Sequence, residues 1–97
     1  MIKRIVKMSF QSEHVPQFLA LFDRVRERIL AQPGCHHVEL WQDIRAPNEL
    51  MTYSVWESEQ DLNTYRNTPL FEEVWRTTKS YFADRAQAWS VHMINQA

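Results

Sequence analysis

The hydrophobic pattern of the chain alternates between two periods, and the order of these periods is what most restricts its fold. Side chains on one face recur every second residue in a strand and every 3.6 residues in a helix. Strand patterns are found at 2–10, 35–43, 49–57 and 85–94, and helical patterns at 13–32 and 58–82. This β-α-β-β-α-β order predicts an α+β, ferredoxin-like fold with a four-stranded antiparallel sheet and both helices on one face.

Proline-containing and polar segments mark the ends of the helices. Pro33-Gly34 follows the first helix, and glycine suits the left-handed conformation that ends many helices. Ser58 followed by Asp61 is a variant of the capping box, and Thr68-Pro69 is typical of a helix start. We therefore expect the second helical segment to consist of two pieces.

Apolar side chains occupy both faces of the predicted strands. On the third strand, Thr52 and Trp56 face one way, whereas Tyr53 and Val55 face the other. Two helices cover only one face, and a sheet face open to water would be more polar. An identical sheet is the simplest cover, so we predict a homodimer joined through the sheet face.

Length, charge and composition limit the classes of protein to which the chain can belong. Ninety-seven residues form one domain, 1–97. The net charge of −1 and the interspersed charges argue against a nucleic-acid surface. No apolar run is long enough for a membrane span, and no secretory signal pattern is evident at the start, so a cytoplasmic location is expected.

Glycine, cysteine and histidine usage limits cofactors and metals. Gly34 and Cys35 are the only residues of their types. Glycine-rich phosphate loops need several glycines, and one cysteine excludes an internal disulfide and a multi-cysteine metal site. His36 and His37 are adjacent on a strand and therefore point to opposite faces. We expect neither a cofactor nor a metal.

The segment VWESEQDLNTYRNTPLFEEVW, within this element order, resembles the antibiotic biosynthesis monooxygenase family. The resemblance extends over nearly the whole chain. It implies a dimeric α+β barrel in which each subunit holds a pocket between sheet and helices. Family members include cofactor-independent oxygenases of phenols, anthrones or quinols, relatives that bind and degrade haem, and many proteins without known activity.

The resemblance carries over to individual positions only in part. In the anthrone-oxidising branch a tryptophan at the position of Trp56 lines the pocket, but Thr52 and Leu62 stand where that branch has asparagine and tyrosine. In the haem-degrading branch the axial histidine falls at Trp75, so ordinary haem degradation is not expected. The other two haem-branch positions fall at Tyr65 and, approximately, Val6.

Seven residues are candidates for a site. We assign catalytic roles to Thr52, Trp56 and Tyr65, and substrate-binding roles to Trp75, Arg66, Val6 and Phe22. Thr52 and Tyr65 would offer hydrogen bonds, the two tryptophans apolar walls, and Arg66 a counter-charge at the mouth. The competing interpretation makes Trp56 a core side chain whose indole N–H meets a backbone carbonyl.

Three functions remain open. The first is a cofactor-independent monooxygenase that oxidises a phenolic, anthrone or quinol-like substrate with O₂, although no general base is evident. The alternative is a non-catalytic dimer that binds a small aromatic or hydrophobic molecule or is associated with stress. An isomerase or decarboxylase would need an acid–base pair that the sequence does not identify.

Overall fold

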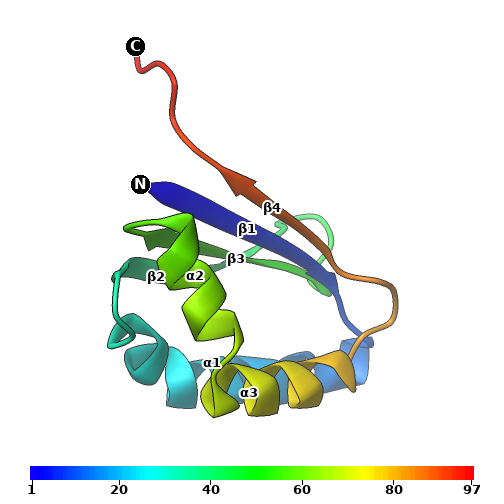
Figure 1. Ribbon diagram of the computed structural model, residues 1–97. Coiled ribbons are helices and arrows are strands. Elements are labelled where there is room, and N and C mark those ends of the chain that lie inside the picture. The colour runs from blue at the N-terminus through cyan, green and yellow to red at the C-terminus, as the bar shows by residue number, and fades with distance from the viewer.

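The computed structural model describes residues 1–97 and contains one antiparallel sheet and three α-helices (Figure 1). The spatial order of the strands is β2 (Cys35–Gln42), β3 (Glu49–Trp56), β1 (Ile2–Ser9) and β4 (Gln87–Val91). The helical elements are a 3₁₀ turn η1 (Ser12–His14) and the helices α1 (Val15–Leu30), α2 (Glu59–Arg66) and α3 (Pro69–Lys79). The predicted ferredoxin-like order is confirmed.

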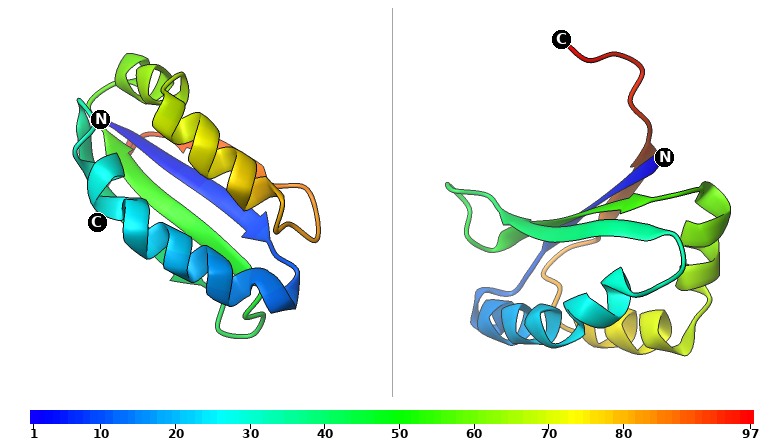
Figure 2. Two further views of the ribbon diagram at one scale, coloured as in Figure 1. Left: turned by 90° about the horizontal axis from the view of Figure 1, so that it is seen from below. Right: turned by 90° about the vertical axis from the view of Figure 1, so that its left-hand side faces the viewer.

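All three helices lie on the same side of the sheet, and the opposite sheet face carries no helix (Figure 2). The sheet register follows the alternation in the sequence. Arg4 of β1 pairs with Ser54 of β3 and Ser90 of β4, whereas Val6 pairs with Thr52 and Ala88. These side chains share the face that meets the helices, because strand side chains alternate between the two faces.

Two element boundaries differ from the sequence prediction. The first α-helix begins at Val15 rather than near residue 13, because a 3₁₀ turn precedes it and Pro16 stands in its first turn. The last strand is shorter than 85–94. Its pairing with β1 ends at Lys3↔Val91, so the residues after Val91 run past the sheet and away from the helices (Figure 1).

Helix ends follow the predicted chemistry. The N-cap hydroxyl of Ser58 accepts a hydrogen bond from the Asp61 backbone N–H at 3.1 Å. Thr68 caps α3 in the same way, accepting from the Phe71 N–H at 3.1 Å, and its own hydroxyl donates to the Tyr65 carbonyl at 2.7 Å. Thr68 therefore caps the start of α3 and also binds the last turn of α2 at the break between the two helices.

The buried apolar side chains form two separate clusters. One combines α1, α2 and the end of β3, namely Leu21, Val25, Ile29, Trp56, Leu62 and Tyr65. The other lies near the opposite end of β1 and consists of Met8, Phe10, Phe18 and Leu50. A domain of this size more commonly has one contiguous core. Partly buried side chains lie between the clusters, among them Phe71, which packs against the first, and Trp75, which packs against the second. No helix of the structure has the length and apolar character needed to cross a membrane.

Candidate functional site

A cavity of about 290 Å³ lies between the sheet and the helices. Members of both core clusters line it, including Trp56 and Tyr65 from one and Met8 and Phe18 from the other. Most of the other lining side chains are also apolar. A concave, mostly apolar space with a few polar groups is the usual form of a small-molecule site.

All seven candidate residues line this one cavity. From the sheet come Val6, Thr52 and Trp56, and from the helices Phe22, Tyr65, Arg66 and Trp75. They approach from β1, β3, α1, α2 and α3, so segments distant in sequence meet here. The structure thus brings the candidates together, whereas their chemical roles stay predictions.

Trp56 is both a core residue and a cavity wall. Its side chain is 1% exposed, and its ring stacks on that of Tyr65 with centroids 5.0 Å apart and planes at 21°. The indole N–H donates to the Ser54 hydroxyl at 2.9 Å. A backbone carbonyl was expected as acceptor, and that expectation is wrong. Strand carbonyls here are engaged in the sheet, and the serine two residues earlier lies on the same face.

Tyr65 and Trp75 both face the cavity although a helix break separates them. Phe71 connects the two rings. It meets Tyr65 edge-on with centroids 5.3 Å apart, and it stacks near-parallel to Trp75 with centroids 6.0 Å apart. Aromatic pairs in these geometries add stability beyond the area they bury. The series Trp56–Tyr65–Phe71–Trp75 forms a continuous aromatic wall. Phe71 was not among the sequence candidates, because its position on the stripe of α3 does not distinguish it from an ordinary core residue.

Arg4 and Arg66 are the only charged side chains among the lining residues. Arg4 rises from the middle of the sheet, and its guanidinium donates to the Ser90 hydroxyl at 3.0 Å. Burial, and secondly the positive charge of Arg66, lower the pKa of Arg4. Arg4 was not among the residues predicted for the site. Its signal was the interruption of an inward-facing apolar series, Ile2, Val6 and Met8, by one arginine.

The phenol of Tyr65 is held in its neutral form. Burial, and secondly the charge of the Cys35 thiolate, raise the pKa of Tyr65 above its ordinary value. Burial also raises the pKa of the Cys35 thiol. Both groups are therefore protonated near neutral pH. Tyr65 can donate a hydrogen bond into the cavity, but it cannot serve there as a phenolate base.

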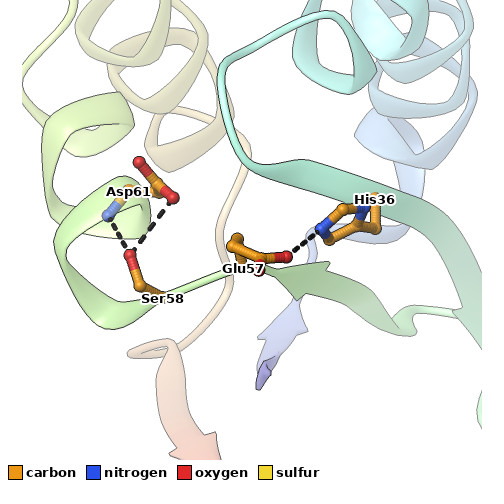
Figure 3. Close-up of polar contacts among 4 residues, drawn as sticks. All are labelled: His36, Glu57, Ser58 and Asp61. Carbon is orange, nitrogen blue, oxygen red and sulfur yellow. Dashed lines mark hydrogen bonds and ion pairs between the residues drawn. The ribbon is translucent and has the colours of Figure 1, made fainter.

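Polar contacts of His36, Glu57, Ser58 and Asp61 stabilise the strand-to-helix corner (Figure 3), and none of these four residues lines the cavity. His36 of β2 lies against the Glu57 carboxylate, with Nε2 and Oε2 2.6 Å apart, and the Ser58 hydroxyl also reaches the Asp61 carboxylate at 3.1 Å (Figure 3). Gly34 has φ of 81°, and a β-carbon there would collide with the Asp61 side chain. The contact between His36 and Glu57 thus holds the end of β3 against β2, and the contacts between Ser58 and Asp61 cap the start of α2.

The sheet face opposite the helices carries several half-exposed large side chains. Trp41 is 41% exposed and stacks on Tyr53 with centroids 5.0 Å apart. Trp89 and Val91 of β4 are 45% and 42% exposed. The Lys3 ammonium donates to the Tyr53 hydroxyl at 2.9 Å. This surface, defined here as the outer sheet face, is more apolar than a solvated sheet face usually is.

Comparison with known proteins places these features in a family. The model of the family described as antibiotic biosynthesis monooxygenase matches residues 1–77. A search of curated proteins gave no match.

Solved structures share the fold at low sequence identity. A structure described as antibiotic biosynthesis monooxygenase superposes with a TM-score of 0.91 at 17% identity, covering 98% of this chain and 100% of that one. A Nitrosomonas europaea protein gives a TM-score of 0.89 at 16% identity, covering 98% and 100%. SnoaB of Streptomyces nogalater, described as a cofactor-independent oxygenase and solved as its N63A mutant, gives 0.86 at 13% identity, covering 98% and 94%.

Proposed function

Because the chain belongs to the antibiotic biosynthesis monooxygenase family, we propose that it is a cofactor-independent monooxygenase of a phenolic, anthrone or quinol-like aromatic substrate. The observation that carries the proposal is the cavity between sheet and helices, which is walled by four aromatic rings. A flat hydrophobic molecule fits such walls. The fold shared with SnoaB, described as a cofactor-independent oxygenase, supports the same reaction class.

The chemistry needs no bound redox group, because the substrate supplies the electrons. For an anthrone, loss of a proton gives an enolate, which passes one electron to O₂. The resulting radical pair combines to form a C–O bond, giving a peroxide. Cleavage of its O–O bond with loss of water leaves a ketone, so the CH₂ group becomes C=O, one oxygen atom enters the product and the other leaves as H₂O.

The lining residues take complementary parts in this reaction. Trp56 and Trp75 hold the ring system, and Val6 and Phe22 complete its apolar surroundings. Neutral Tyr65, together with the Thr52 hydroxyl, donates hydrogen bonds to the oxygen that becomes negative. Fixed donors in a mostly apolar cavity stabilise a developing anion strongly.

No carboxylate or histidine lines the cavity. The substrate proton must therefore pass to water, and the protein assists by stabilising the anion that remains. Arg66 lies at the exposed end of α2 and contributes positive charge toward the cavity. An opposite charge within a few ångströms lowers the pKa of an acid, so a bound phenol or enol ionises more readily.

Oxygen uptake by the purified protein with a panel of anthrones and hydroquinones tests this proposal. The informative variant is Tyr65→Phe, which keeps the stacked ring and removes the donor. Its matched control is Tyr81→Phe, because Tyr81 stacks on His14 and does not line the cavity. We expect a slower rate only in Tyr65→Phe. Uptake no faster than autoxidation for every compound would refute the proposal.

A second candidate function is binding without catalysis. The lack of a carboxylate or histidine in the cavity favours it, since most proton-transferring sites contain such a group. A binding protein would show saturable quenching of tryptophan fluorescence by planar compounds, because Trp56 and Trp75 line the cavity. It would do so without consuming oxygen or forming product.

The protein is also proposed to act as a homodimer joined through the outer sheet face. Support comes from the exposed aromatic and aliphatic side chains there, especially Trp41, Trp89 and Val91. Pairing two such faces would remove these side chains from water, and burial of apolar surface is worth about 25 cal/mol per Å². The helices and the cavity lie on the other side of the sheet, so the contact would leave the cavity free.

A further inference from the structure

We propose that Arg4 and Arg66 form an anion subsite, and that the natural ligand of the cavity is a planar aromatic carboxylate. This inference rests on the proposed function only in taking the cavity as a ligand site. It goes further by naming the substrate class, namely an aromatic ring system that carries a permanently ionised acid group besides its reactive position.

The first support is the unbalanced charge of the cavity. Two guanidinium groups line it, and no acidic side chain does. Neither arginine takes part in an ion pair with a carboxylate; the ion pairs of this chain involve Arg26, His36 and His37. A partly buried charge without an opposite partner is costly. A carboxylate from the ligand would supply the missing charge.

The second support is the position of Arg4. It stands on the inward face of an interior strand, with Ile2 and Val6 before and after it on that face and Ser54 and Ser90 as its cross-strand partners. Arg4 is held in place by the Ser90 hydroxyl at 3.0 Å. Burial and the charge of Arg66 lower the pKa of Arg4. Both effects disfavour the charged form of Arg4, which arginine nevertheless retains at neutral pH. A positive charge kept at the cavity in spite of these unfavourable effects supports a role in binding.

The third support is the number of unused donors. A guanidinium has five N–H donors in a planar fork that matches the two oxygens of a carboxylate. Arg4 uses a donor on Ser90, and no side-chain hydrogen bond engages Arg66. Most of the donors of this pair are therefore free for a ligand. Hydrogen bonds between charged groups are the stronger kind and are often bidentate for arginine.

The aromatic wall and the arginine pair together define the ligand. Trp56, Tyr65, Arg4 and Arg66 all line the same cavity, and Trp56 shares a sheet face with Ser54, the cross-strand partner of Arg4. A ring system held in this cavity can therefore place an acid substituent against the guanidinium groups. A neutral ring would leave these groups without a partner.

Isothermal titration calorimetry with 2-naphthoate and 2-naphthamide tests the subsite. The two probes have the same ring system and differ in charge, and neither is a substrate for oxidation. For the unmodified protein we expect naphthoate to bind at least about tenfold more tightly, as one or two charge-assisted hydrogen bonds would give. Arg4→Gln and Arg66→Gln should each reduce this preference, whereas Arg4→Lys should retain part of it.

Arg24→Gln is the matched control. Arg24 lies on the exposed face of α1 and does not line the cavity, so the substitution removes one positive charge elsewhere on the molecule. Its preference for naphthoate should equal that of the unmodified protein. Arg66→Gln keeps the test valid if Arg4→Gln fails to fold, since Arg66 is exposed at a helix end.

Three outcomes would overturn the subsite: equal affinity for the two probes, an intact naphthoate preference in the folded arginine variants, or no saturable binding of either probe. These outcomes are independent of the proposed reaction. A protein that prefers naphthoate through its arginines but never consumes oxygen would retain the subsite and lose the oxygenase proposal. A protein that oxidises anthrones and binds both probes equally would retain the oxygenase proposal and lose the subsite.

Discussion

The indole ring of Trp56 stacks on the phenol ring of Tyr65 at a centroid distance of 5.0 Å, and this pair joins the sheet to α2 at one end of the cavity. Trp56 is 1% exposed and Tyr65 9% exposed. The same contact therefore supports the fold and shapes the site. Any experiment on these residues has to separate the two contributions.

Substitution at Trp56 should lower the free energy of unfolding by an amount that depends on the size of the replacement. Trp56→Ala would empty a space that is otherwise filled, and we expect it to lower the free energy of unfolding by about 3–5 kcal/mol. Trp56→Phe keeps an aromatic surface but loses the hydrogen bond to Ser54, so a smaller loss is expected. Urea denaturation measures both losses. Equal losses in the two variants would contradict the packing described for Trp56.

Gly34→Ala should be strongly destabilising for a loop position. The backbone there has φ of 81°, which costs a non-glycine residue about 1–2 kcal/mol, and the new methyl group would collide with the Asp61 side chain. We expect a loss of about 2 kcal/mol or more in thermal or urea denaturation. In an Asp61→Ala background the loss should shrink only in part, because the carboxylate group is removed but the β-carbon of residue 61, 2.7 Å from the new methyl group, remains. An unchanged loss in that background would show that Asp61 is not the obstacle.

Tyr65 should make the protein less stable at alkaline pH. Its pKa is raised in the folded state, so above the ordinary value of 10.0 the unfolded chain loses the phenol proton before the folded one does. The folded state then binds more protons than the unfolded state, and stability falls as pH rises. Below that value Tyr65 contributes no pH dependence. The raised pKa of Cys35 acts in the same direction.

The Tyr65→Phe variant measures this contribution. Both proteins of the comparison carry Cys35→Ala, so that the thiol does not titrate. Between about pH 9 and pH 11, the free energy of unfolding should decline less in the Tyr65→Phe variant than in the protein that retains Tyr65, because only the latter has a phenol with a raised pKa. Urea denaturation at a series of pH values gives the comparison. Parallel declines in the two proteins would contradict the burial of the phenol.

The outer sheet face should be sensitive to charge if it joins two subunits. Trp89→Arg places a charge on that face, and Leu19→Arg places the same charge on α1 at a side chain of similar exposure, 42% against 45%. We expect sedimentation to show a dimer for the unmodified protein and for Leu19→Arg, and a monomer for Trp89→Arg. A monomeric unmodified protein would rule out the dimer.

Much of the fold was predictable because each element carries its own local signal. The alternation in β1 and β3, the Ser58 and Thr68 caps and the left-handed Gly34 were all correctly read from sequence. The length of β4 was overestimated, because its extent depends on how far β1 can pair with it rather than on its own residues.

The candidate site was predictable only as a set of residues. The cavity itself depends on how the side chains of two apolar clusters pack in three dimensions. Hydrophobic periodicity does not distinguish a side chain that packs in the core from one that lines a cavity. Arg4 was missed because a single arginine in a strand is usually exposed. Its significance emerges only when Arg66, from another element, is found at the same cavity.

The central claim is that this cavity carries out oxygenation, and labelling with ¹⁸O₂ tests it most directly. Purified protein is incubated with anthrone under ¹⁸O₂, and the quinone is analysed by mass spectrometry beside a protein-free control. The account predicts product formed faster than in the control, with one ¹⁸O atom per molecule, and a slower rate in Tyr65→Phe than in Tyr81→Phe. Product formed no faster than in the control, or with its new oxygen derived from water, would contradict it.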